Sequence, residues 1–412
     1  LYMSAHTHCR VCKNVLPEPF FDLGMMPLAN AFLSSKTECQ HEKSFPLAVS
    51  ACESCGLAQL NYVVPAEQLY RNYIYVSSTS EAVRVHVQAL ANMLMERCGL
   101  GANDLVLEVA SNDGTALREF QKLGMRVLGV EPARNIAAVA NENGVNTVAE
   151  FFNAKTAQDL AESHGRVSAI LARHVFAHVD DVHDFLNGIH EVLAKEGVFV
   201  IEVPYWGDLV DNVEFDTIYH EHLSYFSLGS LSELCDRHDL RIVDIERIGL
   251  HGGSVLVFVK HRESTTTVSG RVHALNEVES KKSYSSLESL ARFTKAVMEW
   301  RVQFEDIVKE ASQEGTALIG YGAAAKGNTL LNFCPDVARE LTGVLDRSPH
   351  KHGHFTPGSH LPVMPVEMLR QQDVSHMVIL AWNFREEIMR QMQSFSDNGG
   401  RFIIPLPEPN IF

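Results

Sequence analysis

The 412-residue sequence lacks the features that would place the protein in a membrane or on nucleic acid. It contains no run of about 18 apolar residues, the length needed to cross a bilayer, and no charged-then-apolar leader. Basic residues are scarce, with 35 Lys and Arg against 51 Asp and Glu, for a formal net charge of −16. Because such a surface repels a phosphate backbone, the composition argues against a nucleic-acid-binding protein.

The sequence also lacks the cysteine pattern of a secreted disulfide scaffold. Apart from two closely spaced pairs, its cysteines are scattered along the chain. They are Cys39, Cys98, Cys235 and Cys334. We therefore expect a reducing, cytoplasmic location. With 46% hydrophobic residues, the chain is long enough to bury two or three cores.

Two CxxC turns are the most recognisable motif, with Cys9 and Cys12 in the first and Cys52 and Cys55 in the second. Thiolates are preferred zinc ligands, and two such turns complete a four-sulfur site with no open position for chemistry. The spacer between the turns exceeds the ~15–20 residues of compact zinc ribbons, which indicates an inserted hairpin or loop. The pattern predicts a structural zinc site. The alternative is two unrelated pairs of reduced thiols, and the substitute ligands left open are His6, His8 and Cys39.

Behind these turns, short apolar strands alternate with helical segments, which predicts parallel, doubly wound sheets. A helix is expected over residues 81–98. Strands are expected at residues 105–109, 125–131, 145–148, 167–172 and 197–203, and again at 316–322, 344–346, 377–381 and 401–405. Polar, helix-biased residues 262–313 separate the two sets. The prediction is an α/β protein of three parts: a zinc-binding module over residues 1–72, an α/β unit over 73–262, and connecting helices with a second α/β unit over 263–412.

The turn after the first predicted strand is a candidate cofactor site, because ligands of doubly wound sheets bind beside that turn. It has a single glycine, Gly114, and so lacks the three-glycine dinucleotide pattern. The carboxylates of Glu108 and Asp113 would repel a diphosphate but suit a sulfonium that carries an ammonium group. Glu131 is placed to accept both hydroxyls of a ribose. The combination of these features favours S-adenosylmethionine over NAD. The alternative is a packing turn, and the candidate cofactor-binding residues are Glu108, Asn112, Asp113, Gly114, Glu131 and Pro132.

A cluster of titratable residues follows the last strong strand of the first set: Tyr219, His220, Glu221 and His222 are consecutive. Imidazole can remove a proton near neutral pH, and a neighbouring carboxylate can orient it. The cluster therefore predicts proton-transfer chemistry. A second metal site and a hydrogen-bonded structural loop remain as alternatives.

A second glycine turn, over residues 320–326, superficially resembles a nicotinamide site with Asp346 as the ribose acid. It lacks the third glycine of that motif. One interpretation is that the helix N-terminus and Lys326 face a diphosphate or the active site. The other is a turn that only packs helix on strand.

These segments together resemble the sugar C-methyltransferases of deoxysugar biosynthesis, the family that contains the tetronitrose C-3 methyltransferase. The resemblance runs along nearly the whole chain, and the order of the motifs is specific. Besides the two CxxC turns, the matching segments are residues 23–28, 73–78, 108–114, 176–178, 219–222, 251–253, 320–326 and 381–383. It implies a zinc-binding N-terminal domain, a central class I methyltransferase domain and a C-terminal Rossmann-like domain. The implied substrate is a nucleotide-linked 4-keto-6-deoxy sugar methylated at C3.

The resemblance also implies roles for individual residues. His222 is expected to be the base that forms an enolate, with Glu221 and Tyr219 orienting it or stabilising the enolate. Tyr75 is a second expected active-site phenol, and Arg173 or His174 is expected to line the cofactor pocket. An O- or N-methyltransferase, an NAD(P)-dependent oxidoreductase and a non-catalytic zinc adaptor remain as alternatives. We expect a monomer that binds neither nucleic acid nor membranes.

Overall fold

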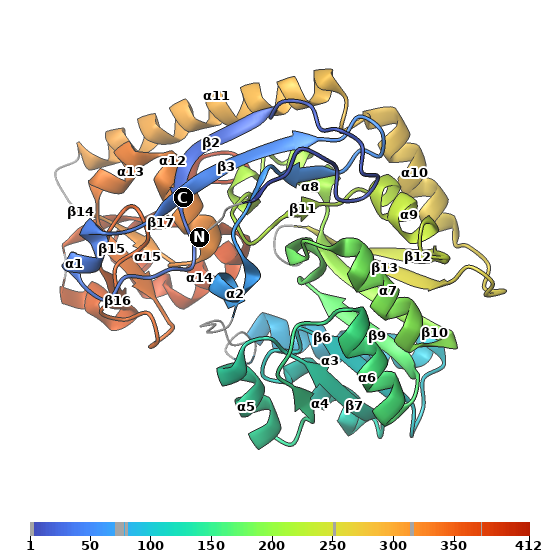
Figure 1. Cartoon of the computed structure of the whole chain (residues 1–412). Helices are drawn as coiled ribbons and strands as arrows, with labels where there is room; N and C mark the ends of the chain where they lie inside the picture. Colours follow the sequence, from blue (N-terminus) through green and yellow to red (C-terminus); the bar gives the residue numbers. More distant parts are fainter. Residues whose placement is uncertain (1–3, 71–77, 79–80, 250–252, 314–316, 372) are drawn as a thin grey trace.

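The protein is built on three sheets of four or more strands, as a computed structural model shows (Figure 1). The structure describes residues 4–70, 78, 81–249, 253–313, 317–371 and 373–412. Tyr75 and residues 251–252, which the sequence marked as candidates, lie outside this set. Within the described part of the chain, no helix has the length and apolar character needed to cross a membrane.

The largest sheet has seven strands in the order β12-β13-β10-β9-β6-β7-β8. Neighbouring strands are parallel, except that β13 is antiparallel to both β10 and β12. The strands are β6 Leu105–Val109, β7 Arg126–Val130, β8 Thr147–Val148, β9 Val167–Arg173, β10 Leu193–Pro204, β12 Leu240–Ile248 and β13 Ser254–His261. The five strands predicted for this unit are confirmed, whereas β12 and β13 were not predicted.

The strand order places a ligand crevice at the carboxyl ends of β6 and β9. The chain moves from β6 to β7 and β8 on one side of the sheet, and to β9 and β10 on the other. Such a reversal is where open α/β sheets bind ligands. All five residues of β6 are buried, as expected for a central parallel strand covered on both faces. The helices of this unit are α3 Glu81–Cys98, α4 Thr115–Lys122, α5 Arg134–Glu142, α6 Ala154–His164, α7 Val182–Val192, α8 Trp206–Asp211 and α9 Leu228–Asp236.

The N-terminal module contributes three strands to a four-stranded antiparallel sheet in the order β11-β4-β3-β2. These are β2 Phe21–Pro27, β3 Ser44–Ala51 and β4 Ala58–Leu60. The fourth, β11 Ser224–Tyr225, comes from the central unit and begins two residues after His222 of the predicted catalytic cluster. The module is therefore joined to that cluster by backbone hydrogen bonds. A small pair, β1 Ser4–Ala5 and β5 Tyr62–Val63, and the helices α1 Lys36–Gln40 and α2 Ala66–Tyr70 complete it.

Two helices connect the central and C-terminal units, as the sequence predicted: α10 Gly270–Lys282 and α11 Leu287–Ser312. The long α11 runs beside β2 and β3 along one side of the molecule and reaches the C-terminal unit (Figure 1). Phe293 of α11 packs edge-on against Phe21 of β2, with ring centroids 5.6 Å apart. Farther along, Trp300 donates to the Pro405 carbonyl at 2.7 Å. A single helix thus spans from the N-terminal sheet to the C-terminal unit.

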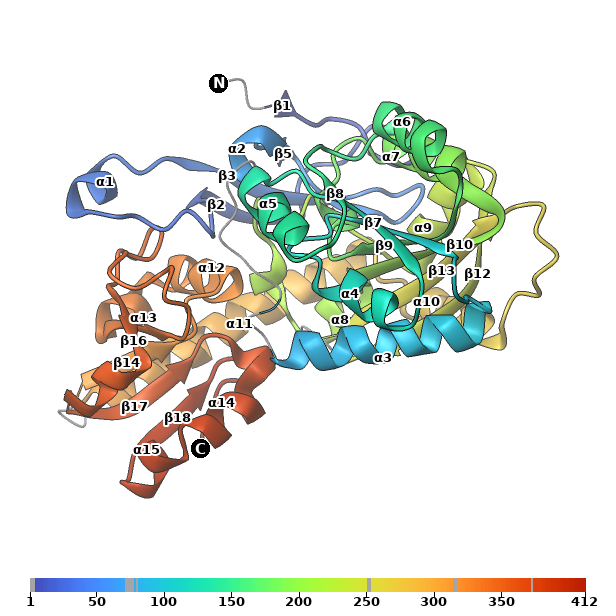
Figure 2. The same cartoon turned by 90° about the horizontal axis from the view of Figure 1, so that it is seen from below.

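The C-terminal unit is a six-stranded sheet in the order β16-β15-β14-β17-β18-β19, lying apart from the seven-stranded sheet in both views (Figure 2). Its order reverses between β14 and β17, which creates a second candidate crevice. The strands are β14 Ala317–Tyr321, β15 Leu341–Asp346, β16 Val363–Pro365, β17 Val374–Ile379, β18 Arg401–Ile404 and β19 Asn410–Ile411. The helices are α12 Ala325–Phe333, α13 Pro335–Glu340, α14 Arg385–Gln391 and α15 Gln393–Asp397. The predicted α/β fold class is confirmed.

Candidate active site

The four cysteines of the two CxxC turns come together. Their sulfur atoms all lie within 4.8 Å of one another, with 3.5 Å between Cys9 and Cys55 and 3.3 Å between Cys12 and Cys52. In a tetrahedral zinc–thiolate site with Zn–S bonds of about 2.3 Å, sulfur atoms are separated by about 3.8 Å. The arrangement fits one closed zinc site, and the sulfur of Cys39 is not part of this cluster.

The turns that carry these cysteines pack against the central unit. Cys9, Val11 and Cys52 are buried in the same apolar cluster as residues of β9, β10 and α9. Zinc would therefore stabilise a surface shared by two parts of the chain, as well as a small module that has little core of its own.

Glu108, near the carboxyl end of β6, is fully buried, and only one of its two carboxylate oxygens has a hydrogen-bond partner. Arg173, at the end of β9, contacts its Oε1 through Nε at 2.8 Å and through Nη2 at 2.7 Å. Its Oε2 is buried and has no hydrogen-bond partner among the described residues. Burial raises the pKa of Glu108 to about 6, against the opposing effect of Arg173. A buried carboxylate oxygen without a donor fits a ligand that carries an ammonium group.

The neighbouring turns are held in strained backbone conformations. Ala110, Asn112 and Gly114 all have positive φ, at 54°, 52° and 76°. The Glu131 carboxylate fixes the turn by accepting the amide of Asn112 at 2.9 Å and that of Ala133 at 2.9 Å. Strain of this kind in non-glycine residues concentrates at functional sites. The geometry matches a cofactor site at the carboxyl edge of β6 and β7.

Two of the candidate cofactor residues, Asp113 and Gly114, make contacts that stabilise the local fold. Asp113 accepts the Thr115 hydroxyl at 2.6 Å, at the start of α4. Gly114 leads into that helix, and a Cβ at its position would meet Val145 Cγ2 at 2.7 Å. Positive φ together with close packing accounts for a glycine here without any ligand.

A histidine–carboxylate network lies at the ends of β9 and β10. The buried carboxylate of Glu202 accepts His174 at 2.9 Å and His86, from α3, at 3.0 Å. Burial by itself would raise the pKa of Glu202, but the two histidines and Arg173 outweigh burial and hold that pKa well below its usual value. His174 has a positive φ of 50°. Both candidates at the end of β9 thus reach buried carboxylates of neighbouring strands.

The predicted catalytic cluster follows the short 3-10 helix Phe215–Thr217, and both ring nitrogens of His222 have hydrogen-bond partners. Its Nδ1 lies 2.7 Å from the Thr217 carbonyl, and its Nε2 lies 2.9 Å from the Tyr219 hydroxyl. Since a carbonyl only accepts, Nδ1 carries the proton and Nε2 accepts from the phenol. Burial lowers the pKa of His222 well below its ordinary value, reinforced by the nearby His178. The imidazole is therefore neutral, with a basic nitrogen on its Tyr219 side.

Other parts of the chain complete the surroundings of this loop. The His178 ring lies 5.0 Å from that of His222, and its Nδ1 is 3.1 Å from the hydroxyl of Tyr70, from α2. The carboxylate of Glu221 accepts the side-chain amide of Asn30 at 2.6 Å. His178, Tyr70 and Asn30 were not among the predicted site residues, although the motif at residues 176–178 offered a signal for the first.

His220 points away from this group. Its Nε2 lies 3.3 Å from the Phe45 carbonyl and 3.2 Å from that of Pro46, both on β3. This fits its omission from the predicted catalytic residues.

The second glycine turn, over residues 320–326, already makes close contacts with other residues of the protein. The Asp346 carboxylate accepts the Ala323 amide at 2.8 Å, and Lys351 donates to the Ala323 carbonyl at 2.7 Å. A Cβ on Gly322 would meet the Ala381 Cβ at 2.6 Å. Close packing and positive φ account for Gly322 without any ligand, so these contacts favour the packing interpretation.

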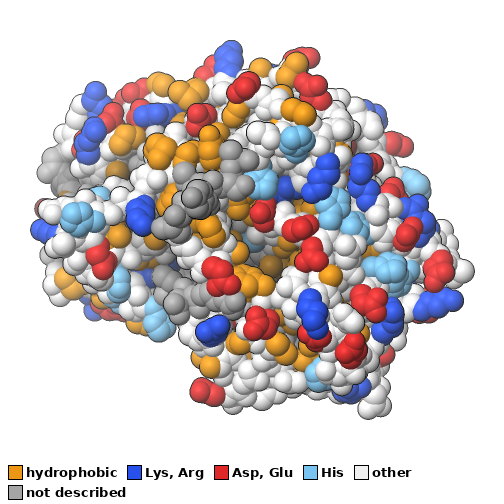
Figure 3. Space-filling model, viewed as in Figure 1, with side chains coloured by type: hydrophobic (Ala, Val, Ile, Leu, Met, Phe, Trp, Pro, Cys, Tyr) orange, Lys and Arg blue, Asp and Glu red, His pale blue; other side chains and the backbone are white. Residues whose placement is uncertain are grey.

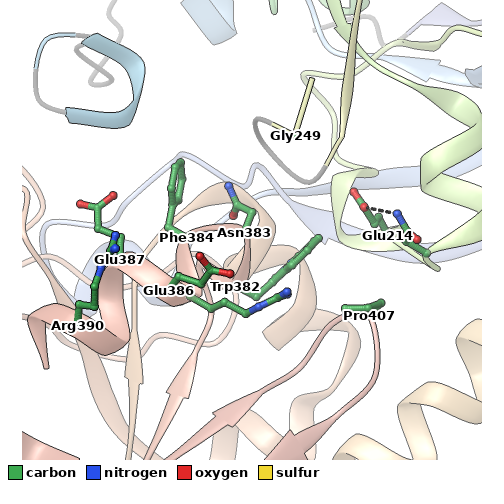
Figure 4. Close-up of a pocket in the computed structure, with 11 residues that line it drawn as sticks. Glu214, Gly249, Trp382, Asn383, Phe384, Glu386, Glu387, Arg390 and Pro407 are labelled. Carbon is green, nitrogen blue, oxygen red and sulfur yellow. Dashed lines mark hydrogen bonds between the residues drawn. The ribbon is translucent and has the colours of Figure 1, made fainter. Parts of the chain in front are cut away.

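A pocket of about 490 Å³ opens at the carboxyl end of β17, between the C-terminal and central units (Figure 4). Trp382 and Phe384 supply aromatic surface and Arg385 and Arg390 positive charge, while Glu214 closes the opposite side. Burial raises the pKa of Glu214 to about 7, against the effect of nearby Lys326. Its full lining is Asn212, Glu214, Gly249, Trp382, Asn383, Phe384, Arg385, Glu386, Glu387, Arg390 and Pro407.

This pocket is connected to the 3-10 helix that precedes the predicted catalytic loop. The indole nitrogen of Trp382 donates to the buried carboxylate of Asp216 at 2.6 Å. Lys326 lies 4.9 Å above the Trp382 ring and 3.7 Å from Glu214. Outside the pocket, basic and acidic side chains are interspersed over the face seen in Figure 3.

Three family models match consecutive parts of the chain: a zinc binding domain at residues 9–70, a methyltransferase domain at 84–245 and a C-methyltransferase C-terminal domain at 249–407. C-methyltransferase NovU of Streptomyces niveus is 37% identical over 403 residues, which cover 98% of this chain and 96% of that protein. A ubiquinone biosynthesis O-methyltransferase of Bartonella bacilliformis is 22% identical over 150 residues, covering 34% of this chain and 60% of that protein.

Among solved structures, magnesium protoporphyrin IX methyltransferase from Synechocystis PCC 6803 with bound S-adenosylmethionine matches 43% of this chain and 79% of its own, at 9% identity and a TM-score of 0.33. The full-length similarity to a C-methyltransferase carries the assignment. The chain therefore belongs to the sugar C-methyltransferase family, as a zinc-binding, S-adenosylmethionine-dependent methyltransferase.

Proposed function

We propose that the enzyme methylates C3 of a nucleoside-diphosphate-linked 4-keto-6-deoxy sugar, with His222 as the base that removes the C3 proton. The observation that carries this proposal is the hydrogen bonding of His222, whose Nδ1–H is held by the Thr217 carbonyl at 2.7 Å. Nε2 is thereby left basic, 2.9 Å from the Tyr219 hydroxyl. A neutral, oriented imidazole can take a proton, and the neighbouring phenol can donate to the enolate oxygen.

The chemistry follows from the ketone at C4. Loss of the C3 proton to His222 Nε2 places negative charge on the ketone oxygen. The Tyr219 hydroxyl, which donates to Nε2, is placed to donate to that oxygen instead. S-adenosylmethionine supplies the electrophilic methyl group when bound, so the C3–methyl bond forms as the sulfur–methyl bond breaks. The Asn30–Glu221 contact holds the carboxylate in place beside the loop.

The pocket at Trp382 is proposed to receive the nucleotide. Its volume of about 490 Å³ suits a nucleoside. Trp382 and Phe384 offer surfaces for stacking a base. Arg385 and Arg390 offer charge to a diphosphate, opposed by the carboxylates of Glu214, Glu386 and Glu387 in the same lining. The Trp382–Asp216 bond joins this pocket to the loop that carries His222, so one substrate could occupy both.

The decisive test is to incubate a panel of 4-keto-6-deoxy sugar nucleotides with the enzyme in D2O and to analyse them by mass spectrometry and NMR. Without S-adenosylmethionine, we expect one deuterium at C3; with it, we expect one methyl group at C3. A methyl group on oxygen or nitrogen, with no C3 exchange, would establish the O- or N-methyltransferase alternative instead.

The C3 exchange rate should be independent of pH near neutrality. Burial lowers the pKa of His222 well below the ordinary 6.5, so the imidazole stays unprotonated as the pH falls from about 8 to about 6.5. The rate should decline only at more acidic pH, where Nε2 gains a proton. A measured midpoint at or above 6.5 would contradict the depressed pKa expected for the buried His222.

We further propose that Glu108 Oε2 binds the ammonium group of the cofactor. Glu108→Gln should raise the Kd for S-adenosylhomocysteine by ~10- to 100-fold, because a hydrogen bond to a charged group contributes about 1.5–3 kcal/mol. In the parent protein, affinity should weaken as the pH falls below about 6, where Glu108 becomes protonated. Titration calorimetry would test both effects, with Glu142→Gln on the exposed face of α5 as the control. Equal affinities for the two variants would disprove this contact.

A further inference from the structure

One buried arginine connects the zinc-binding turn to the catalytic loop. Arg10 lies between the ligands Cys9 and Cys12 and is only 3% exposed. Its Nη1 donates to the carbonyls of Leu60 and Leu223, each at 3.1 Å. Leu60 ends β4 of the N-terminal sheet, and Leu223 is the residue directly after His222.

The backbone around Leu223 is fixed from three directions. Its carbonyl accepts the Leu60 amide at 3.0 Å in addition to the Arg10 guanidinium. Its own amide donates to the Ala177 carbonyl at 2.8 Å. Ala177 precedes His178, whose ring faces that of His222. A change in the position of Leu223 would therefore move the two histidines relative to each other.

The second zinc-binding turn is also connected to the residues that follow His222. Cys52 and Cys55 lead into β4, and β4 pairs with β11 through Ser224 opposite Gln59 and Tyr225 opposite Ala58. The side chain of Gln59 returns to the first turn, because its Oε1 accepts the Arg10 amide at 2.7 Å. Both metal-binding turns thus converge on the strand that begins two residues after His222.

Stability alone is a poor reason to bury this guanidinium. Its hydrogen-bonded carboxylate, Asp180, is 3.2 Å from Nε but half-exposed, the neighbouring Cys9 adds a favourable charge, and Nη2 has no hydrogen-bond partner among the described residues. A buried charge with incomplete pairing usually costs stability relative to an apolar side chain of similar size. The two contacts of its Nη1 are directional: one ends on Leu60, the last residue of β4, and the other on Leu223, directly before β11.

We infer that Arg10 is a positioning residue, which transmits the geometry of the zinc-binding turn to His222 through the Leu60 and Leu223 carbonyls. The catalytic part of this inference rests on the proposed role of His222. The zinc site would then help set the catalytic geometry, in addition to holding the N-terminal module together.

The test compares Arg10→Met and Arg10→Lys with Lys13→Met, which removes an exposed cation beside the same turn. Arg10→Met should retain zinc and its affinity for S-adenosylhomocysteine, yet lower the C3 exchange rate by ~30- to 100-fold, since a misplacement of about 1 Å can cost 10²-fold. Arg10→Lys, which keeps the charge and one donor direction, should recover part of that loss. Lys13→Met should behave as the parent enzyme does.

A second readout needs no substrate. Hydrogen exchange of a peptide spanning residues 217–226, followed by mass spectrometry, should accelerate by about fivefold to tenfold in Arg10→Met, as expected for about 1 kcal/mol of lost hydrogen bonding. Peptides from β6 and β7 should be unchanged. This measurement keeps its meaning even if the parent enzyme shows no C3 exchange, a result that would reject the proposed function rather than the role of Arg10.

Two outcomes would overturn the inference. One is a zinc-loaded Arg10→Met enzyme whose loop exchange and C3 exchange equal those of the parent. The other is a loss of activity that parallels a loss of zinc, with full activity per bound zinc, because Arg10 would then only retain the metal. If Arg10→Met does not fold, the same two comparisons apply to Arg10→Lys.

Discussion

A His222→Gln enzyme should lose methyl transfer by about 10³-fold, within the range typical for removal of a general base, while it keeps its zinc and its affinity for S-adenosylhomocysteine. Glutamine can preserve the contact with the Thr217 carbonyl, which Nδ1 of His222 makes at 2.7 Å, but it has no nitrogen basic enough to take a C3 proton. Single-turnover methyl transfer and C3 deuterium exchange would measure the same step independently. Both rates should fall together.

The same loop offers a matched control for this substitution. His220 is also buried, but its ring contacts the Phe45 and Pro46 carbonyls of β3 rather than Tyr219. His220→Gln should therefore keep most of its C3 exchange at temperatures where it is folded. If His222→Gln retained exchange close to the parent rate, the base would lie elsewhere, and His178 would be the next residue to examine.

The parallel sheets could be predicted from the sequence because their strands are continuous apolar runs. The residues of β6 are all buried, and the predicted bounds of this strand, 105–109, match the structure. The helix predicted over residues 81–98 is also confirmed. Strands buried on both faces leave little ambiguity between surface and core positions.

The N-terminal sheet could not be predicted in the same way. Its fourth strand, β11, is only two residues long and lies more than 160 positions after its partner β4. No local pattern marks such a strand, since its stability comes from the pairing itself. The position of the zinc module against the catalytic loop was therefore accessible only from the structure.

The candidate site could also be predicted only in part from the sequence. Tyr219 and His222 are close in sequence, and the structure joins them by a hydrogen bond. Glu108 was expected to face a cation, and the structure adds that Arg173 already occupies one of its oxygens and leaves the other without a donor. A partner from another strand cannot be read from the spacing of residues in one motif. The catalytic and cofactor roles remain predictions, to be tested by the experiments above.

Loss of the zinc site should remove methyl transfer almost completely but spare cofactor binding. A Cys52→Ser protein should contain little zinc and lose at least ~100-fold in methyl transfer, because structural zinc contributes about 10–16 kcal/mol to the folding of small modules. Without the metal, β4 no longer holds β11 in register, and the Arg10 contacts beside His222 are lost.

Cys39→Ser is the matched control, because the Cys39 sulfur lies outside the four-cysteine cluster. The candidate cofactor residues lie at the ends of β6 and β7, so the Kd for S-adenosylhomocysteine should change little. Metal analysis, calorimetry and methyl-transfer assays on the two variants would separate these effects. Equal zinc content and activity in Cys52→Ser and Cys39→Ser would contradict the structural role of the metal.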